Sequence, residues 1–312
     1  RKLYEGKAFP DCRNAIIYGI RRSGKSSLLN YLTAYLNNTR PDLIAICQNT
    51  QENTNLSGSM IGKVISELYA KSYIDEETRD ALVDKWHVKP ADGDIDPSIL
   101  PDFYIELKKK LNGRGLVLIL DEFDRMIEVL RARNLDTAFY SVLSGMLTSA
   151  TMAETVHFLF CGNKSLIKER QHDQQSTQFF QRMGAGDILV GAMPKSDLVT
   201  MITKSYAKYE GLLFTQEALD LLWTMAGGMV WVSKNIARNA LKFALEAQRM
   251  VVYPSDIYTA ATAFAANDTN CKHFFEGCND DDTIALDAIC SQTARAWQQV
   301  SRDRLMEITA GK

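Results

Sequence analysis

Residues 19–26 read GIRRSGKS and match the pattern G-x-x-x-x-G-K-[S/T] at every defined position. The apolar run Asn14-Ala15-Ile16-Ile17-Tyr18 precedes this loop and is typical of a buried strand, and residues 26–36 are patterned as a helix. A glycine-bearing loop between a strand and a helix can point backbone N–H groups at an anion, and the helix dipole adds partial positive charge. The strand and the helix argue against a chance match in a basic turn, so the stretch predicts a phosphate-binding loop in an α/β core.

The side chains of this loop predict nucleotide chemistry. Lys25 is expected to reach the β- and γ-phosphates and to act in catalysis, and Ser26 is expected to offer its hydroxyl to Mg²⁺. The residues predicted to contact the nucleotide are Gly19, Ile20, Arg21, Arg22, Ser23, Gly24, Lys25, Ser26 and Ser27.

A second run, residues 116–120, consists of five apolar residues and is typical of a central parallel strand that is covered on both faces. Asp121 and Glu122 follow it directly. We expect Asp121 to hold the metal together with Ser26, and Glu122 to orient an attacking water as the catalytic carboxylate. The alternative, a solvated strand end with a helix cap, stays open for Asp124.

Further apolar runs predict three more strands, at residues 43–47, 156–161 and 188–192. Three helices are predicted within residues 58–112, and the polar stretch 48–55 is a candidate to line a ligand cleft. Strands that alternate with helices predict a three-layer α/β core with a parallel sheet. We place this core at residues 1–192.

Helical patterns replace the strand signals after residue 193. They cover residues 196–207, 215–225, 230–247 and 254–265 and predict an all-helical lid domain at 193–266. Residues 267–312 are expected to form a partial winged-helix or helical extension.

The identity of the base can be tested against the Asn-Lys-x-Asp motif with which GTPases bind guanine. Residues 162–166 come close to this motif but have Leu166 where the aspartate is required, so we predict ATP. Asn163, at the end of the strand 156–161, is then expected to lie near the γ-phosphate as a further catalytic residue.

Composition limits the partners and the compartment. The 36 basic and 38 acidic residues give a net charge of -2, so the whole chain does not attract nucleic acid, and any such contact requires a local patch. Arg295, Arg302 and Arg304 are candidates, but the acidic run 280–282 offsets them.

No apolar stretch approaches the roughly 18 residues of a membrane span, and the N-terminus lacks the layout of a signal peptide. We predict a cytoplasmic protein without a membrane partner, and the missing initial Met predicts that residues upstream are absent.

The six cysteines include no C-x-x-C pair. The spacing of Cys271, His273 and Cys278 matches no zinc pattern, so no zinc site is predicted.

With these motifs in place, the sequence resembles the STAND-type signalling ATPases, which are relatives of AAA+ and origin-recognition ATPases. Residues 19–29 resemble their arginine-bearing P-loop (the Walker A motif), and residues 116–124 resemble their strand ending in Asp-Glu (the Walker B motif) with a further Asp. The segment 161–163 is similar to the sensor segment of the family. In the lid, residues 226–228 are similar to the family pattern, but Met229 and Val230 stand where the family has a proline.

The resemblance implies a Mg²⁺-dependent ATPase that works as an oligomeric switch. Arg182 occupies the position from which related ATPases extend an arginine toward a nucleotide, in some cases across a subunit boundary, which implies a homo-oligomer. The output would be control of an attached effector domain or a partner protein, in prokaryotic defence. Two alternatives stay open: an ATP-dependent DNA-binding factor of the origin-recognition or transposition-regulator type, and a site that holds nucleotide for structure with little turnover.

Overall fold

The computed structural model of the chain describes residues 14–50, 56–86, 96–163, 166, 169, 172–183 and 187–266. These residues divide into two compact units: residues up to Met193 together with Met229–Trp231, and the remainder from Pro194 onward. The extension predicted at 267–312, with its cysteines and arginines, lies outside the described residues.

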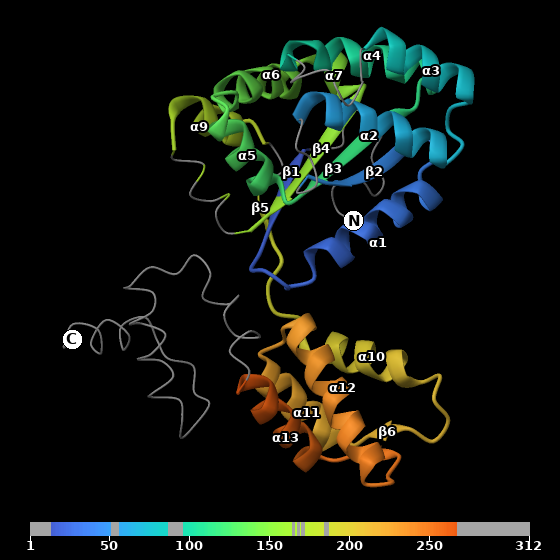
Figure 1. Cartoon of the computed structure of the whole chain (residues 1–312), viewed down its shortest axis with the longest axis vertical. Helices are drawn as coiled ribbons and strands as arrows, with labels where there is room; N and C mark the ends of the chain where they lie inside the picture. Colours follow the sequence, from blue (N-terminus) through green and yellow to red (C-terminus); the bar gives the residue numbers. More distant parts are fainter. Residues whose placement is uncertain are drawn as a thin grey trace, which may run out of the picture. The chain divides into compact units, whose positions relative to one another are not determined.

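The first unit is built on a five-stranded sheet (Figure 1). All neighbouring strands are parallel, and their order is β2-β3-β4-β1-β5. The strands are β1 (Ala15–Tyr18), β2 (Leu43–Asn49), β3 (Gly115–Asp121), β4 (Val156–Gly162) and β5 (Asp187–Leu189). The predicted parallel sheet is confirmed, although β5 runs from Asp187 to Leu189 rather than over 188–192. The N–H of Val190 still donates to the carbonyl oxygen of Tyr18 in β1, at 2.7 Å.

Helices cover both faces of this sheet. One face packs against α1 (Lys25–Thr39), with Leu29 and Leu36 of the helix buried on Ile17, Ile119 and Leu159 of the strands. The other face carries the larger apolar core. Its helices are α2 (Leu56–Ala70), α3 (Glu76–Lys85), α4 (Leu100–Lys110), α5 (Phe123–Ala132), α6 (Asp136–Thr148), α7 (Ala150–Ala153) and α9 (Gln174–Gln181), with the short 3-10 helix η2 (Pro97–Ile99) before α4.

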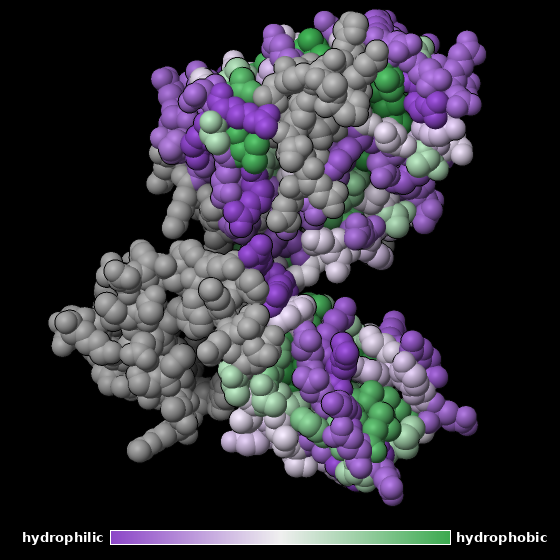
Figure 2. All heavy atoms as spheres, in the orientation of Figure 1, coloured by the Kyte–Doolittle hydropathy of each residue, from purple (hydrophilic) through white to green (hydrophobic). Residues whose placement is uncertain are grey.

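Alternation along the strands explains the layers. Successive side chains of β3 point to opposite faces of the sheet, so Val117 and Ile119 pack with α1 whereas Leu118 and Leu120 pack with the larger core. All seven residues of β3 are buried, as expected for the second strand of a parallel sheet with helices on both sides. Figure 2 shows mainly hydrophilic side chains on the outer surface of α3.

The second unit contains the helices α10 (Lys195–Tyr206), α11 (Gln216–Ala226) and α13 (Pro254–Ala265), together with α12 (Val230–Glu246) from Val232 onward. Their bounds agree with the helical patterns to within two residues. The unit also contains a parallel pair of two-residue strands, β6 (Leu213–Phe214) and β7 (Val251–Val252). The expectation of an all-helical unit omitted this pair, because two residues are too few to show a strand alternation.

None of the helices in the described part of the chain combines the length and the apolar character that a membrane crossing needs.

The turn into α13 is fixed by a partly buried ion pair. Arg249 donates to both carboxylate oxygens of Asp256, at 2.9 and 2.7 Å, and the N–H of Tyr253 donates to the same carboxylate at 2.9 Å. Asp256 is 7% exposed. The hydrogen bonds from Arg249 lower the pKa of Asp256 below its usual value.

We predict that Asp256→Ala lowers the free energy of unfolding by about 1–3 kcal/mol at neutral pH, because the donors of Arg249 and Tyr253 lose their acceptor. Since the pKa is lower in the folded state, the contribution is present above the unfolded pKa and is lost as pH falls through the folded pKa. Guanidinium denaturation at pH 7 and pH 3 would measure this. Equal stability of wild type and variant at pH 7 would contradict it.

Candidate nucleotide-binding site

The loop between β1 and α1 is tight because two of its positions admit only glycine. A Cβ atom on Gly19 would lie 2.5 Å from the carbonyl oxygen of Val190, and Gly24 has φ = 100°, a left-handed conformation that side chains disfavour. Gly24 is also the N-cap of α1 and makes no side-chain hydrogen bond. The first N–H groups of α1 therefore have no side-chain cap from this position and suit an anionic ligand.

Lys25 lies across this loop. Its ammonium donates to the carbonyl oxygens of Gly19 at 3.0 Å and Ile20 at 2.9 Å. The positive charge is thereby held beside the N-terminus of α1, where the helix dipole has the same sign. Phosphate oxygens could replace these two carbonyl acceptors.

Two further groups of the loop fit an acceptor-rich ligand. The hydroxyl of Ser23 and the Nη1 of Arg22 are buried and have no hydrogen-bond partner within the described residues. Leaving a buried donor unsatisfied costs about 1–3 kcal/mol. A ligand with many acceptor oxygens, such as a phosphate chain, would remove that cost.

Ser26 and Asp121 meet although they are 95 residues apart. The hydroxyl of Ser26 donates to Oδ2 of Asp121 at 2.6 Å, from the first turn of α1 to the end of β3. Asp121 is 5% exposed, and its Oδ1 accepts the N–H of Glu122 at 3.0 Å. A hydroxyl and a carboxylate are oxygen ligands of the kind that Mg²⁺ prefers, so this pair fits the metal that a nucleotide would bring.

Glu122 has a strained backbone, with φ = 58° in the left-handed region that a non-glycine residue rarely adopts. Thr50 holds it there. The N–H of Thr50 donates to the carbonyl oxygen of Asp121 at 2.9 Å, and its hydroxyl lies 2.8 Å from the carbonyl oxygens of both Asp121 and Glu122. Thr50 was not predicted as a site residue, and the polar stretch after the strand 43–47 was the only signal for it.

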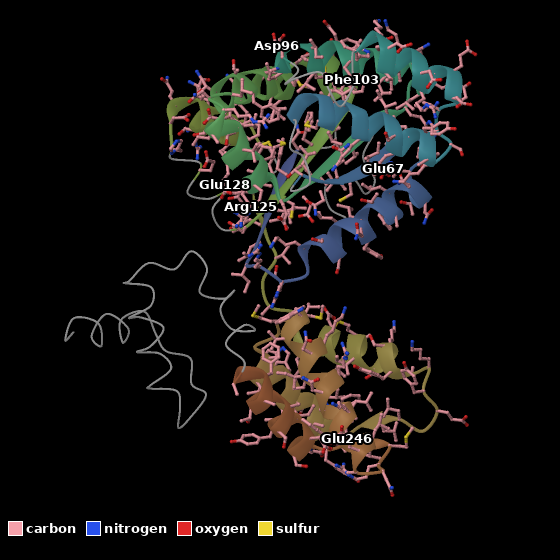
Figure 3. The ribbon with its side chains drawn as sticks, viewed as in Figure 1. Glu67, Asp96, Phe103, Arg125, Glu128 and Glu246 are labelled. Carbon is pink, nitrogen blue, oxygen red and sulfur yellow. The ribbon has the colours of Figure 1, made fainter. Side chains whose placement is uncertain are left out.

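Nearby charges act on the Glu122 carboxyl. Burial raises its pKa, and the carboxylates of Asp121 and Asp124 raise it further. Arg21 and Arg125 oppose this rise. Arg125 is paired with Glu128 at 2.8 Å on the exposed side of α5, where both are labelled in Figure 3.

Asn163 follows β4 directly, and its backbone N–H donates to Oδ1 of Asp124 at 3.4 Å. Asp124 is 6% exposed and lies in the first turn of α5. The alternative that Asp124 is a solvated helix cap is therefore correct only about its position at the start of the helix. Its side chain is buried against the end of β4 instead of being solvated. Asn163 is thus placed at the same strand edge as Asp121, since parallel strands β3 and β4 end together.

Arg182 lies apart from these residues. It is exposed at the C-terminal end of α9, which packs against α6. In the described parts of the chain, its guanidinium makes no hydrogen bond or ion pair with the loop or with Asp121 and Glu122. The structure therefore brings Lys25, Ser26, Asp121 and Glu122 together, but not Arg182.

Comparisons with known proteins identify the fold. No protein-family model matches the sequence, and neither does any curated protein sequence. Solved structures match nearly the whole chain, and three of them are described next. The ORC2 protein of Aeropyrum pernix in ADPNP–ADP complexes has a TM-score of 0.58 and 16% identity, covering 96% of this chain and 73% of that one. Its ADP form has a TM-score of 0.56 and 15% identity, with the same coverage. The Drosophila ORC bound to DNA has a TM-score of 0.51 and 17% identity, covering 98% of this chain and 69% of that one.

At these identities the likeness establishes the fold. The chain shares the fold of these ORC structures, as the resemblance to origin-recognition ATPases predicts. The STAND assignment stays a prediction.

We predict that Lys25→Ala weakens ATP binding about tenfold to a hundredfold, because it removes a charge-assisted hydrogen bond worth roughly 1.5–3 kcal/mol. Titration of the full chain with a fluorescent ATP analogue would measure the loss. Lys71→Ala is the matched control, since Lys71 pairs with Glu67 on an exposed surface at 3.1 Å. An equal affinity for Lys25→Ala and wild type would remove Lys25 from the site.

Proposed function

We propose that the chain binds ATP with Mg²⁺ and hydrolyses it, and that this cycle drives a molecular switch. The observation that carries the proposal is the 2.6 Å hydrogen bond between Ser26 and Asp121, beside the Lys25 ammonium. This hydrogen bond joins the two halves of a phosphate site that the sequence keeps 95 residues apart.

Each side chain has a part in this reaction. Lys25 binds the β- and γ-phosphate oxygens and offsets the charge that develops on them. Ser26 and Asp121 would hold Mg²⁺, which supplies further charge neutralisation between the phosphates. Glu122 accepts a hydrogen bond from the attacking water and takes its proton.

Adenine is the preferred base. Leu166, which stands where a GTPase needs an aspartate for guanine, is 1% exposed and belongs to the apolar core. A buried apolar side chain cannot accept the guanine N–H groups. This supports ATP over GTP.

Assembly through Arg182 is the proposed output step. Arg182, at the C-terminal end of α9, is exposed, as a contact with a neighbouring subunit requires. An arginine that completes the site of the next copy would make hydrolysis depend on oligomerisation. On the resemblance to STAND ATPases, the assembly would control an effector domain or partner protein in prokaryotic defence.

The second candidate is an ATP-dependent DNA-binding factor. The likeness in fold to Drosophila ORC, which was solved bound to DNA, favours it. Binding of this chain to duplex DNA that needs ATP and weakens steeply with salt would support it, and no binding at low salt would rule it out.

We predict that Glu122→Gln lowers kcat by about 10²–10⁴-fold with little change in ATP affinity, because an amide cannot take the proton of water. Steady-state phosphate release together with nucleotide titration would separate the two effects. Glu128→Gln, on the exposed side of α5, is the control. An unchanged rate in Glu122→Gln would instead favour a nucleotide held for structure.

We also predict that wild type gains mass in solution with Mg²⁺–ATP, whereas Lys25→Ala and Arg182→Ala stay small. Light scattering with size-exclusion chromatography would measure this, with Arg238→Ala as an exposed-arginine control. If the mass of wild type never changes, ATP does not assemble the chain by itself, and the DNA-binding alternative gains weight.

A further inference from the structure

We infer that Asp124 is a positioning residue of the hydrolytic site. Its buried carboxylate ties the first turn of α5, next to Glu122, to Asn163 at the end of β4, and thereby fixes these two groups relative to each other. The inference rests on the proposed ATPase function, in which Glu122 activates water, and on the sequence prediction that Asn163 lies near the γ-phosphate.

The contact joins two elements that meet only in the folded chain. Oδ1 of Asp124 accepts the backbone N–H of Asn163 at 3.4 Å, across 39 residues of sequence. Asp124 is 6% exposed, and it lies in the first turn of α5, where the helix dipole favours a negative charge. Asp124 follows Glu122 by two residues. The turn of α5 that begins at Glu122 is therefore hydrogen-bonded directly to Asn163.

The contact between Asp124 and Asn163 requires a glycine at position 162. A Cβ atom at position 162 would lie 2.4 Å from Oδ1 of Asp124 and 2.6 Å from Cδ1 of Leu166. Real Cβ atoms essentially never approach that closely, so any larger residue would push the carboxylate away from Asn163. The glycine and the aspartate therefore depend on each other.

Stability alone does not account for a carboxylate at this position. The preceding residue, Phe123, already packs α5 against β4, with its ring 4.4 Å from Phe160 and 6.3 Å from Phe179. Burying a charge is costly, and well-packed apolar residues often stabilise a protein as well or better. What an apolar residue could not supply at 124 is an oriented acceptor for the Asn163 N–H.

Orientation at this point matters for rate. A misplacement of about 1 Å at a catalytic group can cost on the order of 100-fold in rate. Glu122 sits in a strained backbone conformation that its neighbours must hold, and Asp124 anchors the helix that begins there. Loss of the anchor should therefore change turnover more than nucleotide binding.

The test compares Asp124→Ala, Asp124→Asn and Gly162→Ala in the full chain. Asparagine keeps an oxygen acceptor and is the conservative variant. Asp256→Ala is the matched control, because Asp256 is also a buried first-turn aspartate, at 7% exposure, in α13. Unfolding midpoints establish that each variant is folded.

The first readout is amide hydrogen exchange at Asn163 in nucleotide-free protein, which does not depend on turnover. We expect exchange to rise about tenfold in Asp124→Ala and in Gly162→Ala, to stay near wild type in Asp124→Asn, and to be unaffected in Asp256→Ala. Unchanged exchange in Asp124→Ala and in Gly162→Ala would overturn the inference.

The second readout is the split between kcat and KM. Asp124→Ala and Gly162→Ala should lower kcat on the order of 10–100-fold with KM within about threefold, and Asp124→Asn should recover most of the rate. A normal kcat in folded Asp124→Ala would overturn the inference, as would a loss that Asp124→Asn does not recover.

If Asp124→Ala does not fold, Asp124→Asn and Gly162→Ala decide by the same criteria. If wild type itself has no turnover, the proposed function fails, whereas the exchange result still reports whether Asp124 holds Asn163.

Discussion

The carboxylate of Asp121 is the point on which the candidate site depends. It ends β3, the second strand of the sheet, at the edge where the parallel strands finish. Ser26 donates to it from α1, Thr50 donates to its carbonyl oxygen from the end of β2, and Glu122 donates to it from the next position in the chain. The carboxylate of Asp121 thus joins α1 to the end of β3, and the backbone carbonyl of the same residue joins the end of β2 to it.

A buried carboxylate needs such donors, because an uncompensated charge in the interior is strongly unfavourable. The donors in turn place the groups that chemistry would use. Ser26 is aligned beside Lys25 because both lie in the first turn of α1, and Glu122 is held in a strained backbone conformation by Thr50. The same contacts that offset the burial of Asp121 therefore orient the site.

Much of the fold could be predicted from the sequence, because its strands are buried on both faces. Fully apolar runs such as 116–120 leave little doubt about a central parallel strand, and the helical patterns of residues 193–266 give the helices of the second unit to within two residues. The strand pair β6 and β7 was not predicted, because each strand has only two residues and the paired residues lie nearly 40 positions apart in the sequence. Strand pairing of this kind is a property of the folded chain and leaves no local pattern.

The sequence by itself determined the residue types of the phosphate site. The glycines, Lys25 and Ser26 stand at a spacing that a loop before a helix requires, and Asp121 with Glu122 stands at a strand end. Only the tertiary structure decided which of these groups meet, that Thr50 supports Glu122, and that Asp124 is buried against Asn163 instead of capping a helix in solvent. The reason is physical: the spacing of residues along the chain fixes local backbone geometry, whereas contacts across 39, 72 or 95 residues are set by strand order and packing.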